Sequence, residues 1–105
     1  MSQFHAHKNL DSLTADFAQF VLDIQSPLLQ KLGTVMVVPL IKKSKYAGMQ
    51  IKHLNPVLLI DGESYLMMTQ SMFSMPRNDI GHSVNDFSSQ SHEIVAAIDC
   101  LLSGI

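Results

Sequence analysis

The sequence of 105 residues has no tryptophan, one cysteine and few charged residues. The single cysteine, Cys100, cannot form a disulfide within the chain, so a disulfide framework is excluded and a reducing compartment is indicated. Charged residues make up 15% of the chain and the formal net charge is −2, which argues against a general polyanion-binding protein. We therefore expect no direct binding of nucleic acid by this chain alone.

Long apolar segments are also missing. No uncharged run approaches the roughly 18 residues of a membrane span, and residues 1–10 lack the apolar centre of an export signal. These absences predict a cytoplasmic protein with no membrane partner. The chain is 47% hydrophobic and long enough to bury a core as one domain over residues 1–105. Its low charge leaves apolar surface for a partner.

Motifs of catalysis and phosphate binding are equally absent. The sequence has no nucleophile elbow, and its glycines are too isolated to form a phosphate-binding loop. Asp61 and Glu63 look like paired carboxylates, but they belong to a turn and its exit, where such residues are expected. His5 and His7 have the spacing of some zinc ligands, yet no further ligand supports them. We predict no catalytic residue, no metal, no other cofactor, and a chain that is not an enzyme.

What the sequence does contain is a strong hairpin signal between Pro56 and Pro76. Two apolar runs, Val57–Ile60 and Tyr65–Met75, flank Asp61-Gly62, the dipeptide that best supplies the positive φ values of a type I′ turn. The second run is apolar on both faces near its middle, which is typical of a central strand or of one bent around a small barrel. We take this hairpin as the scaffold of the fold.

Further strands are predicted on both sides of the hairpin. Their ranges are 3–7, 17–25, 34–40 with its end at Pro39, and 77–87 with turns at Asn78-Asp79 and Asn85-Asp86. The connection over residues 41–54 is irregular and basic. Its lysines can contact phosphates, stay solvated, or attract an acidic peptide.

The C-terminal segment is the one predicted helix. Ser88 is its predicted N-cap, and Gly104 suits the left-handed position that ends a helix. An apolar stripe for the sheet to cover consists of Ile94, Ile98, Leu101, Leu102 and Ile105. The opposite side carries Ala96, Cys100 and Ser103. These small residues form either a second packing face, such as a dimer contact, or an exposed surface with little charge. An apolar chain end predicts docking, on the protein's own core or on a partner.

Methionine is abundant, with seven residues. Flexible thioethers fill gaps in cores and also serve adaptable binding surfaces. We predict core positions for Met36, Met67 and Met68, and leave both interpretations open for Met72 and Met75.

Six blocks of this sequence, in order and at near-identical spacing, resemble the CcdB family of toxin–antitoxin toxins. The blocks are SQF at residues 2–4, DIQS at 23–26, MVVPL at 36–40, LNPVLLIDGESYLMMTQSMFSMP at 54–76, Ile80-Gly81, and EIVAAIDCLLSGI at 93–105. The resemblance is weakest over residues 8–16 and 41–52. Because it covers nearly the whole chain, the chain is identified as a member of this family.

The resemblance implies an α+β fold that is mainly β: a small SH3-like barrel of antiparallel strands with one C-terminal helix. It also implies a homodimer that binds the DNA gyrase A subunit, traps it with cleaved DNA, and is neutralised by a CcdA-like antitoxin. The residues at the positions of the family's gyrase contact are Leu28, Leu29, Asp99, Leu102, Ser103, Gly104 and Ile105. We assign Lys42, Lys43 and Lys45 to antitoxin binding, because they would attract an acidic peptide.

Two positions depart from the family pattern. Ser103 stands where the family has a tryptophan, the kind of buried aromatic anchor that often carries most of a binding energy. Pro27 stands where the familiar member of the family has an acidic residue. Two alternative functions are therefore kept. One is an endoribonuclease toxin, because Kid and MazF toxins use the same barrel. The other is a homologue that binds the antitoxin but has lost gyrase poisoning.

Overall fold

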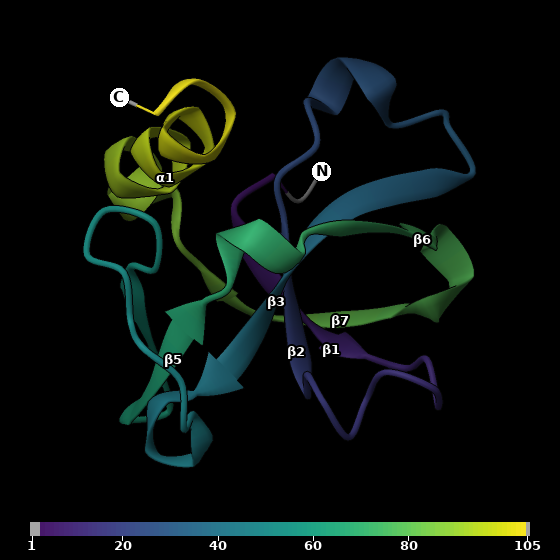
Figure 1. The fold of residues 1–105 in the computed structure, drawn as a ribbon. Helices are drawn as coiled ribbons and strands as arrows, with labels where there is room; N and C mark the ends of the chain where they lie inside the picture. Colours follow the sequence, from purple (N-terminus) through teal and green to yellow (C-terminus); the bar gives the residue numbers. More distant parts are fainter. Residues whose placement is uncertain (1–2, 105) are drawn as a thin grey trace.

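The computed structural model describes residues 3–104, which form one curled antiparallel sheet with a helix laid across one end (Figure 1). The strands and the helix are β1 (His5–Asn9), β2 (Phe20–Asp23), β3 (Thr34–Lys42), β4 (Val57–Ile60), β5 (Glu63–Met67), β6 (Phe73–Pro76), β7 (Ile80–Asp86) and α1 (Ser91–Ser103). The short 3-10 turns are η1 (Pro27–Leu29), η2 (Lys43–Lys45), η3 (Thr69–Ser71), η4 (Arg77–Asp79) and η5 (Ser88–Gln90).

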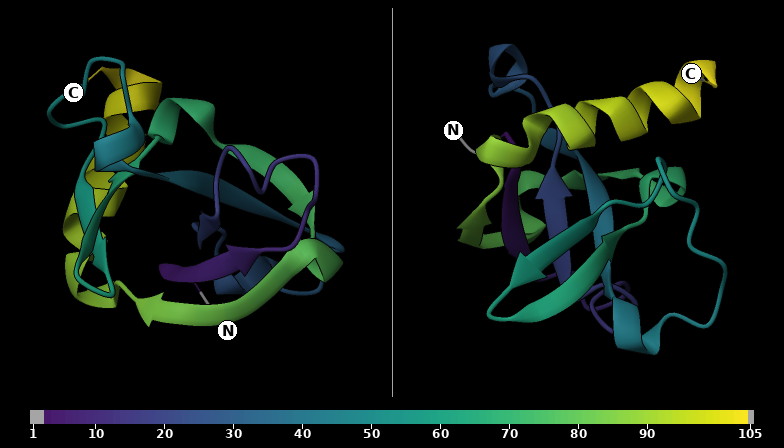
Figure 2. Two further views of the ribbon diagram at one scale, coloured as in Figure 1. Left: turned by 90° about the horizontal axis from the view of Figure 1, so that it is seen from below. Right: turned by 90° about the vertical axis from the view of Figure 1, so that its left-hand side faces the viewer.

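The sheet curls into a half-barrel. Its strand order is β4-β5-β3-β2-β1-β7, and β6 pairs with β3 beside this path. Strands β4 and β7 are therefore the two ends of the order, and the curl brings them together (Figure 2, left). Between them the side chain of Asn85 donates a hydrogen bond to the carbonyl of Leu59 at 3.0 Å. The predicted fold class, an antiparallel barrel-like sheet with one C-terminal helix, is confirmed.

The predicted turn of the central hairpin is confirmed as well. Strands β4 and β5 pair from Val57 opposite Leu66 to Ile60 opposite Glu63. The two residues between them have positive φ, 52° at Asp61 and 78° at Gly62. A type I′ turn requires positive φ at both central positions, and this explains the Asp-Gly pair.

The second arm of the hairpin is not the single strand Tyr65–Met75 that the sequence predicts. Strand β5 ends at Met67, the chain turns through η3, and β6 then resumes the sheet. Both strands pair with β3: β6 with its first half and β5 with its last three residues. A long strand with two successive partners makes the sheet curl, because each partner twists away from the other.

Strand β3 also runs past its predicted end at Pro39 and reaches Lys42. Pro39 lies where the partner of β3 changes from β6 to β5. Proline is tolerated where a strand does not need a ladder donor. Its carbonyl still accepts a hydrogen bond from the Met68 amide at 3.0 Å.

The junction between β7 and α1 differs from the prediction in two ways. Asn85 and Asp86 end strand β7 and do not form a turn. Ser88 is not the N-cap of the helix, since α1 begins at Ser91 and its N-cap residue, Gln90, makes no side-chain cap hydrogen bond. Instead, Ser88 opens η5 and donates its amide and hydroxyl to the Asp86 carboxylate.

The main core lies between the inner face of the sheet and the first half of α1. Its helix residues, Ile94 and Ala97, are fully buried. The rings of Phe20 and Tyr65 meet edge to face with centroids 5.4 Å apart. Met67 and Met68 are buried as predicted, but the prediction for Met36 is wrong, since 37% of it is exposed.

A smaller cluster lies on the other side of the sheet. It is built from Val21, Val35, Val37 and Met75, with Phe73 and Ile80 packed against it. Among residues 3–104, no helix has the length and apolar character needed to cross a membrane.

Truncation of the buried helix residue tests this packing. Ile94→Ala should lower the free energy of unfolding by about 2–5 kcal/mol, because it leaves a cavity between α1 and the sheet. The matched control is Val95→Ala, because the Val95 side chain is 44% exposed. This control should change the free energy of unfolding by less than about 0.5 kcal/mol. Urea unfolding followed by circular dichroism measures both; equal losses would contradict the packing described.

Candidate functional site

The second half of α1 projects beyond the core. The predicted apolar stripe holds through Ile94 and Ile98, but 37% of Leu101 and 75% of Leu102 is exposed. Exposed apolar residues on a helix end are a feature of surfaces that bind partners. Leu101 and Leu102 are therefore not packed fully on the protein's own core, and docking of this helix end on a partner stays a prediction.

The last turn of α1 is fixed by its own hydrogen bonds. Gly104 has a φ of 74°, in the left-handed region, and its amide donates to the carbonyl of Cys100 at 2.9 Å. This confirms the predicted role of Gly104 as the residue that ends the helix. The hydroxyl of Ser103 turns back and donates to the carbonyl of Asp99 at 2.7 Å. Asp99, Ser103 and Gly104 are all exposed, and Ile105 lies outside the described residues.

The second predicted contact region, η1, is also exposed but rigidly held. Its side chains Leu28 and Leu29 are 92% and 47% exposed. Pro27 occupies the first position of the turn, and the hydroxyl of Ser26 accepts a hydrogen bond from the Leu28 amide. Arg77 donates to the carbonyl of Leu29. Proline is pre-organised for a helical first turn, so Pro27 stiffens η1.

Gln25 connects η1 to strand β3. Its side-chain amide donates to the carbonyls of Leu29 and Thr34, and its oxygen accepts from the Met36 amide at 2.9 Å. The two leucines of η1 are therefore presented by a backbone that is held from two sides.

The two predicted contact regions lie at the same end of the barrel. Both α1 and η1 appear at the top in Figure 1 and in the right-hand view of Figure 2. Among residues 3–104 no hydrogen bond joins η1 to α1. The two regions do not pack on each other, and in the right-hand view of Figure 2 η1 appears above the start of α1, with the C-terminal end of the helix at the far side.

The predicted antitoxin lysines lie at the opposite end. Lys42 and Lys45 line a pocket of about 660 Å³ at the open mouth of the barrel, together with Phe17, Tyr46 and Tyr65. We call it the barrel-mouth pocket. Lys43 is exposed but does not line it. Sequence reasoning missed this pocket, because residues 15–19 and 40–46 meet only when the sheet curls.

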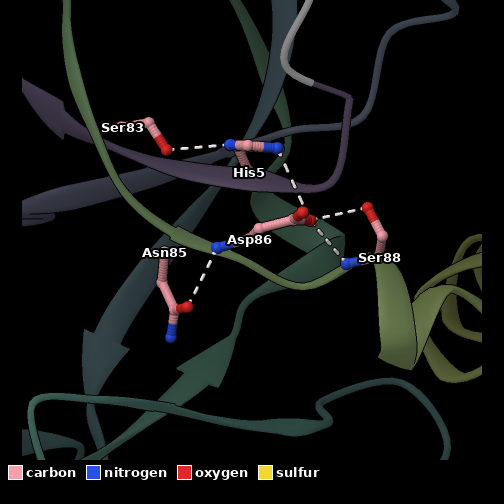
Figure 3. Close-up of polar contacts among 5 residues, drawn as sticks. All are labelled: His5, Ser83, Asn85, Asp86 and Ser88. Atoms are coloured by element: carbon pink, nitrogen blue, oxygen red, sulfur yellow. Dashed lines mark hydrogen bonds and ion pairs between the residues drawn. The ribbon is translucent and has the colours of Figure 1, made fainter.

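A polar network holds the strand β1 against the end of β7 (Figure 3). The ring of His5 contacts the Ser83 hydroxyl at 2.8 Å through Nδ1 and the Asp86 carboxylate at 3.5 Å through Nε2. Asp86 also accepts the amide and hydroxyl of Ser88 at 2.9 and 2.6 Å. The order Ser–His–Asp resembles that of a catalytic triad, yet neither Ser83 nor His5 lines the barrel-mouth pocket.

The hydrogen bonds from Ser88, first from its hydroxyl and then from its amide, lower the pKa of Asp86, and the charge of His5 adds a smaller effect. The network therefore stabilises the ionised carboxylate at the start of η5. Its structural effect is to fix the direction in which the chain leaves β7 for α1.

His7 is the other histidine of this strand. It is 7% exposed, its Nδ1 lies 3.0 Å from the carbonyl of Gly81, and its Nε2 is buried without a hydrogen-bond partner among the described residues. The rings of His5 and His7 have centroids 6.3 Å apart. Within residues 3–104 no group of three or more His, Cys, Asp or Glu side chains is placed to hold a metal ion.

Comparison with protein families gives a match over almost the entire chain. The family described as "CcdB protein" matches residues 3–104. The chain belongs to the CcdB family. The resemblance inferred from the six sequence blocks is thereby confirmed, and the chain is assigned to the toxins of toxin–antitoxin systems.

Two solved structures share the fold of this CcdB-family chain. One is "Mycobacterium tuberculosis toxin MazF-mt6", with a TM-score of 0.72 and 16% identity over 93% of this chain and 95% of that chain. The other is an "Endoribonuclease in complex with its cognate antitoxin from Mycobacterial species", with a TM-score of 0.74 and 9% identity over 97% of this chain and 94% of that one. Because the sequence identity is so low, these two similarities establish the fold of the chain and nothing about its activity.

The prediction that the chain is not an enzyme is wrong. It relied on the absence of catalytic motifs in the sequence, but a protein with the same half-barrel is an endoribonuclease. A linear motif search does not connect residues that come from separate segments, such as residues 15–19 and 40–46, which meet at the barrel-mouth pocket.

The lowered pKa of Asp86 predicts a pH dependence of stability. A carboxylate whose pKa is lower in the folded state stabilises the fold above its ordinary value of 3.8, and this stabilisation is lost as pH falls through the folded pKa. Asp86→Asn keeps an oxygen acceptor for Ser88 but cannot ionise. Thermal unfolding of both proteins should therefore show a wild-type advantage at pH 7 that disappears at strongly acidic pH. A difference in thermal stability between the two proteins that does not vary with pH would contradict this role of the Asp86 carboxylate.

Proposed function

We propose that this CcdB-family toxin binds the A subunit of DNA gyrase and traps the gyrase–DNA cleavage complex, and that a CcdA-like antitoxin neutralises it. The observation that carries the proposal is the exposed apolar end of α1, where Leu101 and Leu102 leave the core. The rigid turn with Leu28 and Leu29 supports it from the same end of the barrel. Gyrase acts in the cytoplasm, and we expect the toxin there.

Ser103 changes how this surface would bind. Its hydroxyl is occupied by the carbonyl of Asp99, so it offers little to a partner. Without an aromatic side chain at this position, the apolar contact falls mainly on Leu102 and Leu28, which are 75% and 92% exposed. Full burial of a leucine contributes about 1.5–3 kcal/mol. Two such leucines can replace part of the energy that one buried tryptophan supplies.

The proposal includes a homodimer. The face of α1 that carries Ala96 and Cys100 is exposed to half-buried in one chain, and small residues allow two helices to approach closely. Binding of an acidic segment of the antitoxin to Lys42, Lys43 and Lys45 remains a prediction. Lys43 is the member of this set that lies outside the barrel-mouth pocket.

Removal of the helix end tests the gyrase proposal. Deletion of residues 103–105, or Leu102→Asp, should abolish growth arrest in cells without antitoxin and weaken binding to purified gyrase A subunit at least about tenfold. Leu13→Asp is the matched control, because Leu13 is 90% exposed on a loop at the other end of the barrel. This control should remain toxic.

The growth assay also separates the alternatives. Growth arrest that survives the deletion would contradict the proposal. Normal growth with the intact toxin, together with retained antitoxin binding, would identify a homologue that has lost gyrase poisoning.

A second candidate function is RNA cleavage by an endoribonuclease toxin. It is favoured by the shared fold with a solved endoribonuclease and by a pocket that combines lysines, tyrosines and a carboxylate. Incubation of the pure protein with mRNA tests it: sequence-dependent cleavage fragments are expected, and intact RNA would exclude this function.

A further inference from the structure

The segment between β2 and β3, residues 26–33, exposes its apolar side chains. Leu28, Leu29 and Leu32 are 92%, 47% and 49% exposed. The first two lie in η1, and the third follows it. Exposed apolar groups on one short segment are a feature of surfaces that bind a partner. A loop offers such a surface in a defined shape only if other residues hold its backbone in place.

Arg77 holds three carbonyls of this segment. It follows strand β6 directly and opens η4. Its backbone amide donates to the carbonyl of Gly33 at 3.0 Å, which continues the pairing of β6 with β3. Its side chain donates from Nε to the carbonyl of Leu32 at 2.6 Å and from Nη2 to the carbonyl of Leu29 at 3.3 Å. Arg77 therefore ties most of the segment to the corner that follows β6.

The guanidinium of Arg77 is half-buried and has no acidic partner. In the described part of the chain, no carboxylate lies within 4.0 Å of it. Its positive charge therefore acts on the two carbonyls, and hydrogen bonds from a charged donor are about twice as strong as neutral ones. The planar guanidinium presents its donors at a fixed spacing, which an ammonium group cannot reproduce. Lysine at this position would not hold both carbonyls.

Gln25 holds the same segment from its other side. Its side-chain amide donates to the carbonyls of Leu29 and Thr34, at 3.3 and 3.2 Å. The carbonyl of Leu29 is thus shared by Gln25 and Arg77. Only Arg77 of these two side chains also donates to the carbonyl of Leu32. The position of the third leucine therefore depends on Arg77.

A flexible loop that a partner covers loses conformational freedom, and this loss weakens binding. A loop that already has its bound conformation avoids the loss. We propose that Arg77 is a positioning residue for the gyrase contact. It holds residues 29–33 so that Leu32 joins Leu28 and Leu29 on the surface that the A subunit covers. This inference rests on the proposed function, and it adds to that function one contact residue and one residue that acts through the loop.

Binding kinetics of the intact chain with purified gyrase A subunit, measured by surface plasmon resonance, test the inference. Arg77→Met removes the donors but keeps an unbranched side chain. It should weaken binding at least about tenfold, because two charge-assisted hydrogen bonds no longer hold the loop. The loss should lie mainly in the association rate, since the variant adopts the binding conformation less often but makes the same contacts once bound. Leu32→Ala should instead raise the dissociation rate, because it removes a contact.

Gly33 allows a rescue experiment. Its φ is not positive, and a Cβ at this position would meet no atom within 4 Å. Gly33→Ala therefore fits the loop and reduces its conformational freedom. Added to Arg77→Met, it should restore affinity about two- to fivefold, although it supplies no hydrogen-bond donor. A direct contact between Arg77 and gyrase would not be restored in this way.

Lys31→Met is the matched control, because it removes the same charge from the same segment. Lys31 is exposed and makes no ion pair within residues 3–104. This control should bind gyrase with wild-type affinity. Arg77→Lys keeps the charge but loses the planar group, and its affinity should stay at least about threefold below that of the wild type.

Two further measurements separate a positioned loop from a damaged fold. Circular dichroism should give the same spectrum for the wild type and every variant. The amides of Leu29, Gln30 and Leu32 are hydrogen-bonded within the segment. In the free protein their hydrogen exchange should be faster in Arg77→Met than in the wild type, and unchanged in Lys31→Met. If Arg77→Met does not fold, Arg77→Lys takes its place in these comparisons.

Several results would overturn the inference alone. They are wild-type affinity of Arg77→Lys, an equal loss in Lys31→Met, a loss confined to the dissociation rate, or no rescue by Gly33→Ala. In each of these cases the wild type still binds gyrase, so the proposed function stands. A wild type that does not bind the A subunit would contradict the proposed function and, with it, the role of Arg77.

Discussion

The burial of Ile94 and Ala97 against the inner face of the sheet is the interaction on which the rest of the structure depends. It anchors the first half of α1 and leaves the second half to extend beyond the core. The Asp86–Ser88 hydrogen bonds, held by His5 from strand β1, set the direction in which the helix starts. One buried helix turn and one polar junction thus determine where Leu102, Ser103 and Gly104 are presented.

The two ends of the half-barrel have different chemistry. The end with α1 and η1 presents exposed leucines, and α1 also carries the exposed Asp99. Exposed leucines suit an apolar protein partner. The other end presents a pocket with aromatic rings and two lysines that have no ion-pair partner within residues 3–104. Because the surfaces do not overlap, substitutions at one end can be made without changing the other.

Local signals explain which parts of this structure the sequence predicts well. Asp61-Gly62 predicts its turn because the tendency of an Asp-Gly pair to adopt positive φ is a local property, independent of the rest of the fold. Gly104 predicts the end of α1 for the same reason.

The break between β5 and β6 was missed because it depends on β3 exchanging one partner strand for another, which is a long-range event. Exposure of Met36 and assembly of the pocket around Lys42 and Phe17 likewise depend on the curl of the sheet. The family could be recognised from six short blocks, because each block is read directly from neighbouring residues. The claim that the chain is not an enzyme relied on missing motifs, and a solved endoribonuclease with the same fold contradicts it.

Our central proposal is that the exposed end of α1, together with the separate turn η1, engages gyrase. Hydrogen exchange of the intact toxin, alone and with purified gyrase A subunit, tests it most directly. The account predicts slower exchange of the amides of the last turn of α1 and of Leu28 and Leu29 in the complex, with no change around Lys42 and Lys45. Protection confined to the barrel-mouth pocket, or no protection in either region, would contradict it.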